Sequence, residues 1–191
     1  MTTQTPDSQR PRSFLEEVVA ATPGDSRLEM CIQCGTCGGS CPSGADMDHT
    51  PRALFALIRA DLRAEVLKSN TPWYCVSCYY CTVRCPQAVH ITDLMYTLKN
   101  LAIRAKLYHD NPAAGLAKTF TDQVEAYGRS FEFGLATRHN LRHRPFSLPG
   151  MAPLGLGLLS KGRLDLTPHR IQQLEQLQQI LARAKQLEEA A

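Results

Sequence analysis

The residues in this sequence best suited to chemistry are cysteines, and they occur in two short runs. The stretches CIQCGTCGGSCP, from Cys31 to Pro42, and CVSCYYCTVRCP, from Cys75 to Pro86, share the pattern C-x2-C-x2-C-x3-C-P. All eight cysteines of the chain lie in these two runs. A disulfide-stapled secreted domain scatters its cysteines so that bridges can close loops. The bunching therefore indicates metal or redox chemistry.

Three chemistries use cysteines at short spacing: structural zinc, redox-active dithiols and iron–sulfur clusters. Zinc sites usually take their ligands as separated pairs, because two knuckles approach the metal from opposite sides. Three evenly spaced thiols followed by a fourth suit a cubane cluster, and this spacing is that of bacterial ferredoxins. The pattern predicts two [4Fe–4S] clusters, with structural zinc as the weaker alternative.

The two runs are expected to exchange ligands. In two-cluster proteins with this spacing, the fourth cysteine of each run binds the cluster of the other run. No thiol then remains for attack on a disulfide, so no catalytic residue is expected on this chain. His49 and His90 lie just beyond the loops and are not expected to be ligands, because eight thiols fill eight sites. The predicted ligands are Cys31, Cys34, Cys37 and Cys85 for cluster 1, and Cys75, Cys78, Cys81 and Cys41 for cluster 2.

The two loops differ in the residues between their cysteines. The first loop is rich in glycine, which lets backbone N–H groups approach sulfur, and such hydrogen bonds raise the reduction potential. The second loop carries bulkier residues at these places, among them Tyr79 and Tyr80. The two clusters are therefore expected to differ in potential.

The segments around the loops have the signals of helices. Thr50 is a predicted N-cap with Pro51 at the first helical position, and apolar residues at i, i+4 spacing extend the predicted helix to about Ser69. Abundant Leu, Ala, Arg and Gln favour helix over sheet, so the fold class is predicted as all-α. Further helix starts are predicted at the capping boxes Ser13/Glu16 and Ser26/Glu29, at Thr92 and at Asn111-Pro112.

Several functions have no support in the sequence. The N-terminus lacks the apolar core of an export signal, which makes the cytoplasm the expected location. The apolar stretch Leu148 to Leu159 is interrupted by prolines and glycines and is too short to span a bilayer. No dinucleotide fingerprint or phosphate-binding loop occurs, and the basic run Arg138 to Pro145 lacks the features of a nucleic-acid site. The formal charge of +3 becomes about −1 once two clusters of about 2− each are bound.

The cysteine runs CIQCGTCGGSCPSG and CVSCYYCTVRCP, together with the tail PLGLGLLSKGRLDLTPHRI, resemble the C subunit of heterodisulfide reductase and its relatives. The resemblance covers about Glu29 to Ile171. It implies an α-helical ferredoxin domain whose clusters relay electrons between a flavin- or haem-linked donor and a catalytic subunit. The implied partners are a catalytic HdrB-like subunit and a flavoprotein HdrA-like subunit, with membrane contact only through a partner.

The sequence therefore predicts three segments: a flexible N-terminal segment at 1–12, the α-helical ferredoxin domain with two [4Fe–4S] clusters at 13–110, and a helical C-terminal extension for subunit docking at 111–191. The function implied is that of an oxidoreductase electron-transfer subunit, active as part of a complex and without its own substrate site. Two alternatives remain: a free-standing ferredoxin-like carrier, and a related subunit of a quinone-linked membrane oxidoreductase.

Overall fold

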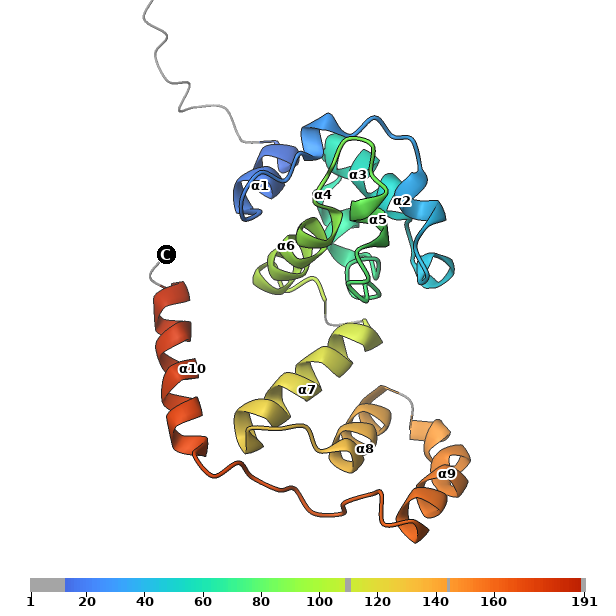
Figure 1. The fold of residues 1–191 in the computed structure, drawn as a ribbon, viewed down its shortest axis with the longest axis vertical. Coiled ribbons are helices and arrows are strands. Elements are labelled where there is room, and N and C mark those ends of the chain that lie inside the picture. The colour runs from blue at the N-terminus through green and yellow to red at the C-terminus, as the bar shows by residue number, and fades with distance from the viewer. Residues whose placement is uncertain (1–12, 109–110, 144, 190–191) are drawn as a thin grey trace, which may run out of the picture. The chain divides into compact units, whose positions relative to one another are not determined.

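The structure is a computed structural model that describes residues 13–108, 111–143 and 145–189. Helices and connecting loops make up all of this described part, which contains no strand (Figure 1). The predicted all-α fold class is confirmed. The predicted N-terminal segment 1–12 lies outside the described residues. The chain divides into two compact units, residues 1–110 and 111–191, which are described separately below.

The first unit is built around α6, the helix that follows the second cysteine run. Leu94 and Leu98 of α6 are fully buried against α1 and α4, and α5 packs at its start. Phe14 and Val18 of α1 and Phe55 of α3 complete a single apolar core. The helices are α1 (Phe14–Ala21), η1 (Leu28–Met30), α2 (Thr36–Gly39), η2 (Gly44–Asp46), α3 (Pro51–Arg59), α4 (Arg63–Lys68), α5 (Tyr80–Val83) and α6 (Ile91–Arg104).

The linker between the cysteine runs differs from the single helix predicted for it, because the chain breaks into α3 and α4 at Asp61. Asp61 has a left-handed backbone with φ +61°. The N–H groups of Asp61 and Leu62 donate to the carbonyls of Ile58 and Leu57 at 3.1 Å each, which is the Schellman arrangement that ends a helix. The Asp61 carboxylate accepts a 2.6 Å hydrogen bond from the Phe14 N–H, so a contact with α1 supports the break.

The other helix starts follow the sequence signals to different degrees. The capping box of Ser13 and Glu16 is confirmed, and so is the N-cap role of Asn111, whose side chain accepts from two backbone N–H groups. Thr50 caps α3 as predicted. The capping box predicted at Ser26 is wrong: η1 begins at Leu28 after a left-handed Arg27. Helix α6 begins at Ile91, one residue before the predicted Thr92.

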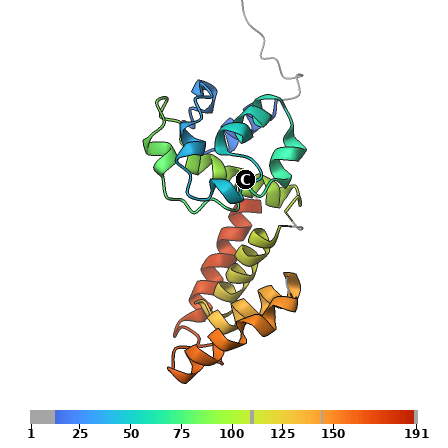
Figure 2. The same ribbon diagram turned by 90° about the vertical axis from the view of Figure 1, so that its right-hand side faces the viewer.

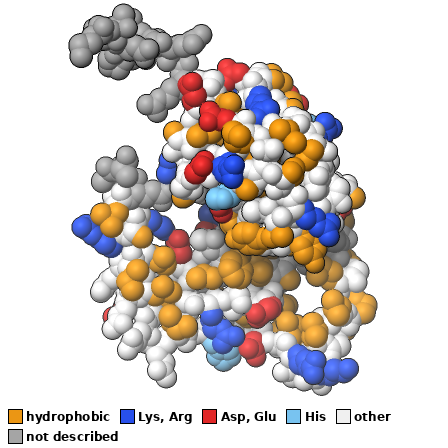
Figure 3. Space-filling model, turned by 45° about the horizontal axis from the view of Figure 1, so that its top comes forward, with side chains coloured by type: hydrophobic (Ala, Val, Ile, Leu, Met, Phe, Trp, Pro, Cys, Tyr) orange, Lys and Arg blue, Asp and Glu red, His pale blue; other side chains and the backbone are white. Residues whose placement is uncertain are grey.

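The second unit consists of α7 (Pro112–Tyr127), α8 (Glu132–His143), η3 (Pro145–Ser147), α9 (Leu148–Ser160) and α10 (Leu174–Glu189). Helix α7 packs against α8 and α10, and Figure 2 shows α7 and α10 side by side. The apolar stretch that is too short to span a bilayer, with its prolines and glycines, lies in the continuous helix α9, with Pro153 inside it. Leu154 and Leu156 of α9 are more than half exposed. Exposed hydrophobic side chains lie between charged ones on the face shown in Figure 3.

The described helices include none with both the length and the apolar character that a membrane crossing requires.

Asp61 provides a test of the helix break. Asp61→Val places a β-branched residue at positive φ and removes the acceptor for Phe14 N–H, so the free energy of unfolding is expected to fall by about 2–4 kcal/mol. Asp61→Asn is the matched control, because asparagine tolerates the left-handed conformation and keeps a side-chain oxygen. Urea unfolding followed by circular dichroism measures both. Equal stability of the two variants would contradict this account of the break.

Candidate iron–sulfur centre

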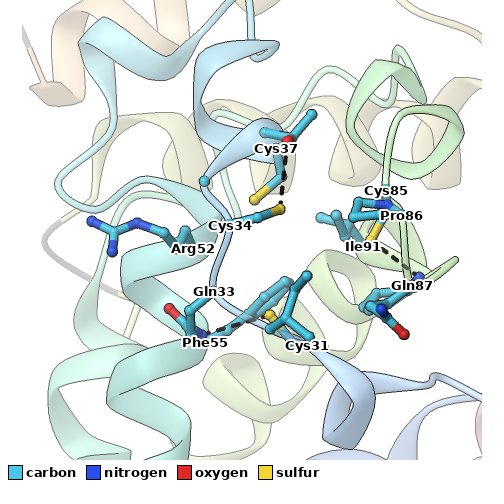
Figure 4. Close-up of a pocket in the computed structure, with 14 residues that line it drawn as sticks. Cys31, Gln33, Cys34, Cys37, Arg52, Phe55, Cys85, Pro86, Gln87 and Ile91 are labelled. Carbon is cyan, nitrogen blue, oxygen red and sulfur yellow. Dashed lines mark hydrogen bonds between the residues drawn. The ribbon is translucent and has the colours of Figure 1, made fainter.

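The first group of predicted ligands lies around one pocket, here called site 1. Cys31, Cys34 and Cys37 of the first run and Cys85 of the second line it. Figure 4 shows the sulfur atoms of these four cysteines facing a common space, with Arg52 and Phe55 of α3 at its wall. The fourth thiol of the second run therefore lies with the first three of the first run.

The second group lies around a separate pocket, here called site 2. Cys75, Cys78 and Cys81 of the second run line it, together with Cys41 from the first run. The rest of the wall is largely apolar and includes Met47, Pro51, Val76, Ile91 and Met95. Ile91 also lines site 1, so the two sites are neighbours with a shared wall.

A set of polar contacts brings Cys41 to the second run. Backbone N–H groups and side chains pair reciprocally: Asp48 N–H donates to Asn70 Oδ1 and Asn70 N–H to Asp48 Oδ2, each at 2.7 Å. The hydroxyl of Thr71, which is fully buried, donates to the His49 carbonyl at 2.8 Å and accepts from His49 N–H at 3.1 Å. These bonds tie the segment after the first run to the segment before the second run.

A corresponding tie brings Cys85 to the first run. The His90 N–H, in the segment after the second run, donates to the Ser26 carbonyl at 3.0 Å, in the segment before the first run. Arg59 of α3 supports this segment, since its guanidinium donates to the carbonyls of Leu28 at 3.2 Å and Glu29 at 2.9 Å. The segment after each cysteine run is thus hydrogen-bonded to the segment before the other run, which is the arrangement that ligand exchange requires.

The two cysteine loops have the same backbone form. In the first, Gln33 and Gly35 have φ values of 59° and 83°. In the second, Ser77 and Tyr79 stand at the same places with φ values of 54° and 62°. A short helix follows each loop, α2 and α5, and the two pack against each other. A non-glycine residue at positive φ is uncommon, so Tyr79 holds a conformation that the equivalent Gly35 adopts without strain.

Burial and hydrogen bonding perturb several of the thiols. Burial raises the pKa of Cys37 to about 11, and it also raises the pKa values of Cys41 and Cys81. The Thr36 hydroxyl, with Oγ1 3.4 Å from Cys34 Sγ, lowers the pKa of the exposed Cys34. Cysteine binds iron as the thiolate, so metal binding at the buried thiols is coupled to proton release.

The donor set of each site fits an iron–sulfur cluster. Four thiols line each pocket, and the described lining includes no carboxylate or imidazole. Thiolates are soft ligands, which suit clustered iron. Among the residues that the structure describes, no three or more Cys, His, Asp or Glu side chains converge on a single metal ion. A cubane is held at separate iron corners, so its thiols need only line a common space.

The structure places both histidines beside carboxylates. His49 Nε2 lies 3.7 Å from Glu65 Oε1, and His90 Nδ1 lies 3.8 Å from Asp93 Oδ2. Sequence reasoning missed other residues at site 1, namely Gln33, Arg52 and Gln87. Gln33 could have been found by aligning the two runs, because Ser77 stands at its place. Arg52 had no such signal, since its position depends on how α3 packs.

Comparison with known proteins identifies this region. A family model described as a 4Fe-4S dicluster domain matches residues 27–89. Similar proteins include the C subunit of the H(2):CoB-CoM heterodisulfide,ferredoxin reductase of Methanothermobacter marburgensis, 39% identical over 94 residues, which are 49% of this chain and 50% of that protein. The iron-sulfur C subunit of the CoB–CoM heterodisulfide reductase of Methanopyrus kandleri is 38% identical over 99 residues, 52% of each chain.

A third relative, the C subunit of the ferredoxin:CoB-CoM heterodisulfide reductase of Methanosarcina mazei, is 43% identical over 74 residues, 39% of this chain and 45% of that protein. Residues 27–89 thus match an iron–sulfur domain of the dicluster type, and the predicted resemblance to the C subunit of heterodisulfide reductase is confirmed. The chain spans about half the length of the curated relatives it matches. These matches are shorter than the predicted span from Glu29 to Ile171.

The ligand exchange between runs is testable by combining substitutions. Cys41→Ala is expected to remove one of the two clusters, the one at site 2, because Cys41 lines that site. Adding Cys75→Ala should then cause little further loss of iron. Adding Cys31→Ala instead should remove the second cluster as well. Iron per chain and electron paramagnetic resonance (EPR) spin counts measure the outcome.

The matched control is Cys85→Ala, which should show the reverse dependence, since Cys85 lines site 1. If Cys41→Ala combines with Cys31→Ala without further loss, each run binds its own cluster and the exchange is wrong.

Proposed function

We propose that this chain is the iron–sulfur electron-transfer subunit of a heterodisulfide reductase-like complex. It would relay electrons in the cytoplasm between a flavin-containing or membrane-bound subunit and a catalytic subunit of the HdrB-like kind. The observation that carries the proposal is that all eight cysteines line two neighbouring sites, four at each. The names of the similar proteins, which are reductase C subunits, point the same way.

The thiol inventory supports a relay rather than a catalyst. A disulfide is reduced by a thiolate or at a metal with an open position. Here the eight cysteines of the chain are taken up by the two proposed clusters. Chemistry on a disulfide or sulfur substrate is therefore assigned to a partner.

The arrangement of the two sites suits electron passage through the domain. A [4Fe–4S] cluster, when bound, takes up and releases one electron. Ile91 lines both sites, and the short helices α2 and α5, which carry Cys37 and Cys81, pack against each other. Cys34 of site 1 and Cys78 of site 2 are exposed. Each site thus has an inner edge towards its neighbour and an outer edge that a partner can approach.

The second unit is the proposed region for subunit docking. Its helix α9 is apolar on all sides, and helices of this kind are normally buried by other protein. Leu154 and Leu156 are 63% and 66% exposed, and Phe146 of η3 is 97% exposed. The segment 133–164 contains no Asp or Glu, whereas Arg138, Arg142, Arg144, Lys161 and Arg163 are basic. A partner with an apolar cleft and an acidic rim would match this surface.

The isolated full-length chain tests the relay. With both clusters loaded, it is expected to accept electrons from an artificial donor and return them to an artificial acceptor, without reducing any disulfide offered. The absence of turnover follows from the lack of a spare thiol. Turnover by the isolated chain that survives removal of trace partners would show that a substrate meets a cluster directly and would refute the relay.

Truncation after Asp110 tests the docking region. Every cysteine precedes Pro86, so both clusters are expected to remain, with unchanged iron content. Co-purification with a co-produced catalytic subunit should be lost. The paired substitution Leu154→Ser and Leu156→Ser in the full chain is the milder form of the same test. Retention of the complex by both variants would place docking on the first unit.

A further inference from the structure

The two sites use the same loop backbone but differ in the side chain at one equivalent position. In site 1, Gln33 Nε2 donates a hydrogen bond to Cys31 Sγ at 3.6 Å. In site 2 this position is held by Ser77, whose hydroxyl instead pairs with the Tyr96 hydroxyl at 2.8 Å. Both residues have nearly the same left-handed φ, so the difference comes from the side chain and not from the path of the backbone.

Further donors reach the sulfur atoms of site 1. The Val89 N–H donates to Cys85 Sγ at 3.4 Å. The Cys34 thiol donates to Thr36 Oγ1 at 3.4 Å, and once Cys34 binds iron as the thiolate the Thr36 hydroxyl is the group that can donate. Hydrogen-bonding groups thus reach three of the four sulfurs of site 1, those of Cys31, Cys34 and Cys85.

Site 2 also has polar groups near its cysteines. The hydroxyls of Thr82 and Thr92, 3.4 Å apart, act on Cys81 and lower its pKa against the effect of burial. The clearest difference between the sites is at the first cysteine of each run, where Gln33 donates to Cys31 and the equivalent Ser77 pairs with Tyr96 instead.

The walls of the two sites differ in charge as well. Arg52 lines site 1, with its side chain packed against Gly35, and the amides of Gln33 and Gln87 line the same pocket. The described lining of site 2 carries no charged side chain and includes Met47, Met95 and Tyr79. Tyr79 occupies in the second loop the place of Gly35, so an aromatic residue lines site 2 where the Arg52 side chain lies beside Gly35 in site 1.

These differences all favour a higher reduction potential at site 1 than at site 2. A cluster that accepts an electron becomes more negative, and N–H donors and cations stabilise the added charge. An apolar wall disfavours it. The site with more donors therefore holds the electron more tightly.

We propose that site 1 is the higher-potential centre of the pair and that Gln33 is a positioning residue that sets part of the difference. This inference rests on the proposed function, since it requires a cluster in each site. A single electron added to the two clusters then resides mainly on the cluster that Cys31, Cys34, Cys37 and Cys85 would bind. A donor that reduces the domain delivers to site 2 and an acceptor withdraws from site 1 when flow runs downhill.

The test is a redox titration of the full-length, cluster-loaded protein followed by EPR. Gln33→Ser gives the first loop the residue that the second loop accepts at this backbone position. It is expected to lower the higher of the two midpoint potentials by about 59 mV, which is a tenfold change in the equilibrium constant of a one-electron couple. The lower midpoint should not move.

The reciprocal variant, Ser77→Gln, places an amide beside Cys75 and is expected to raise the lower midpoint. Ile32→Val is the matched control, because Ile32 is the neighbour of Gln33 in the same loop and is mostly exposed. It should leave both midpoints unchanged. If the Gln33→Ser variant does not retain its clusters, Gln33→Asn takes its place and is expected to lower the higher midpoint. Ser77→Gln is still expected to raise the lower midpoint.

The outcomes separate this inference from the proposed function. If Gln33→Ser moves only the lower midpoint, site 1 is the lower-potential centre and the inference is overturned. If neither Gln33→Ser nor Ser77→Gln moves a midpoint, Gln33 has no such role. If the wild-type chain binds no pair of clusters, the proposed function fails before the inference is reached.

Discussion

The pairing of each run's fourth cysteine with the first three of the other run is the constraint on which the first unit depends. It requires the segment after each run to lie beside the segment before the other run. Two sets of hydrogen bonds satisfy it: Asp48 and His49 with Asn70 and Thr71 on one side, and His90 with Ser26 on the other. These contacts close long loops, and closing a loop costs conformational entropy. The apolar core around α6 supplies the stabilisation that offsets this cost.

The same constraint explains why the linker between the runs is two short helices. The linker has to leave the first run, cover the core and return beside its own starting point, and a straight helix cannot do this. The break at Asp61 reverses the direction between α3 and α4, while α4 packs on α6. Arg63 of α4 forms a two-pronged ion pair with Glu17 of α1, with N–O distances of 2.8 and 2.9 Å, so the turn contacts α1 at Asp61 and again two residues later.

The two cysteine loops have the same backbone conformation, but the sites that they form differ in the side chains around them. Equivalent positions carry Gln33 and Ser77, or Gly35 and Tyr79, and the sites differ in hydrogen bonding and apolar cover accordingly. A relay gains direction when its two centres differ in potential. The second unit has a different character, since α9 leaves large apolar side chains exposed and has basic residues around it.

The chemistry and the helical class could be predicted from the residues alone, because both depend on local patterns. The spacing within each cysteine run determines which thiols one loop can present, and the cap at Thr50 and the N-cap at Asn111 act over two or three residues. The break at Asp61 could not be predicted, since the contact that supports it is with Phe14, 47 residues away. Arg52 at the wall of site 1 was missed for the same reason, because the packing of α3 brings it there. The extension at 111–191 was predicted to be helical, but the bounds of α9 were not predicted, because its proline and glycine residues disfavour helix locally. Where an interaction joins residues distant in sequence, only the folded chain decides it, because the free energy of that contact exists only once both partners are in place.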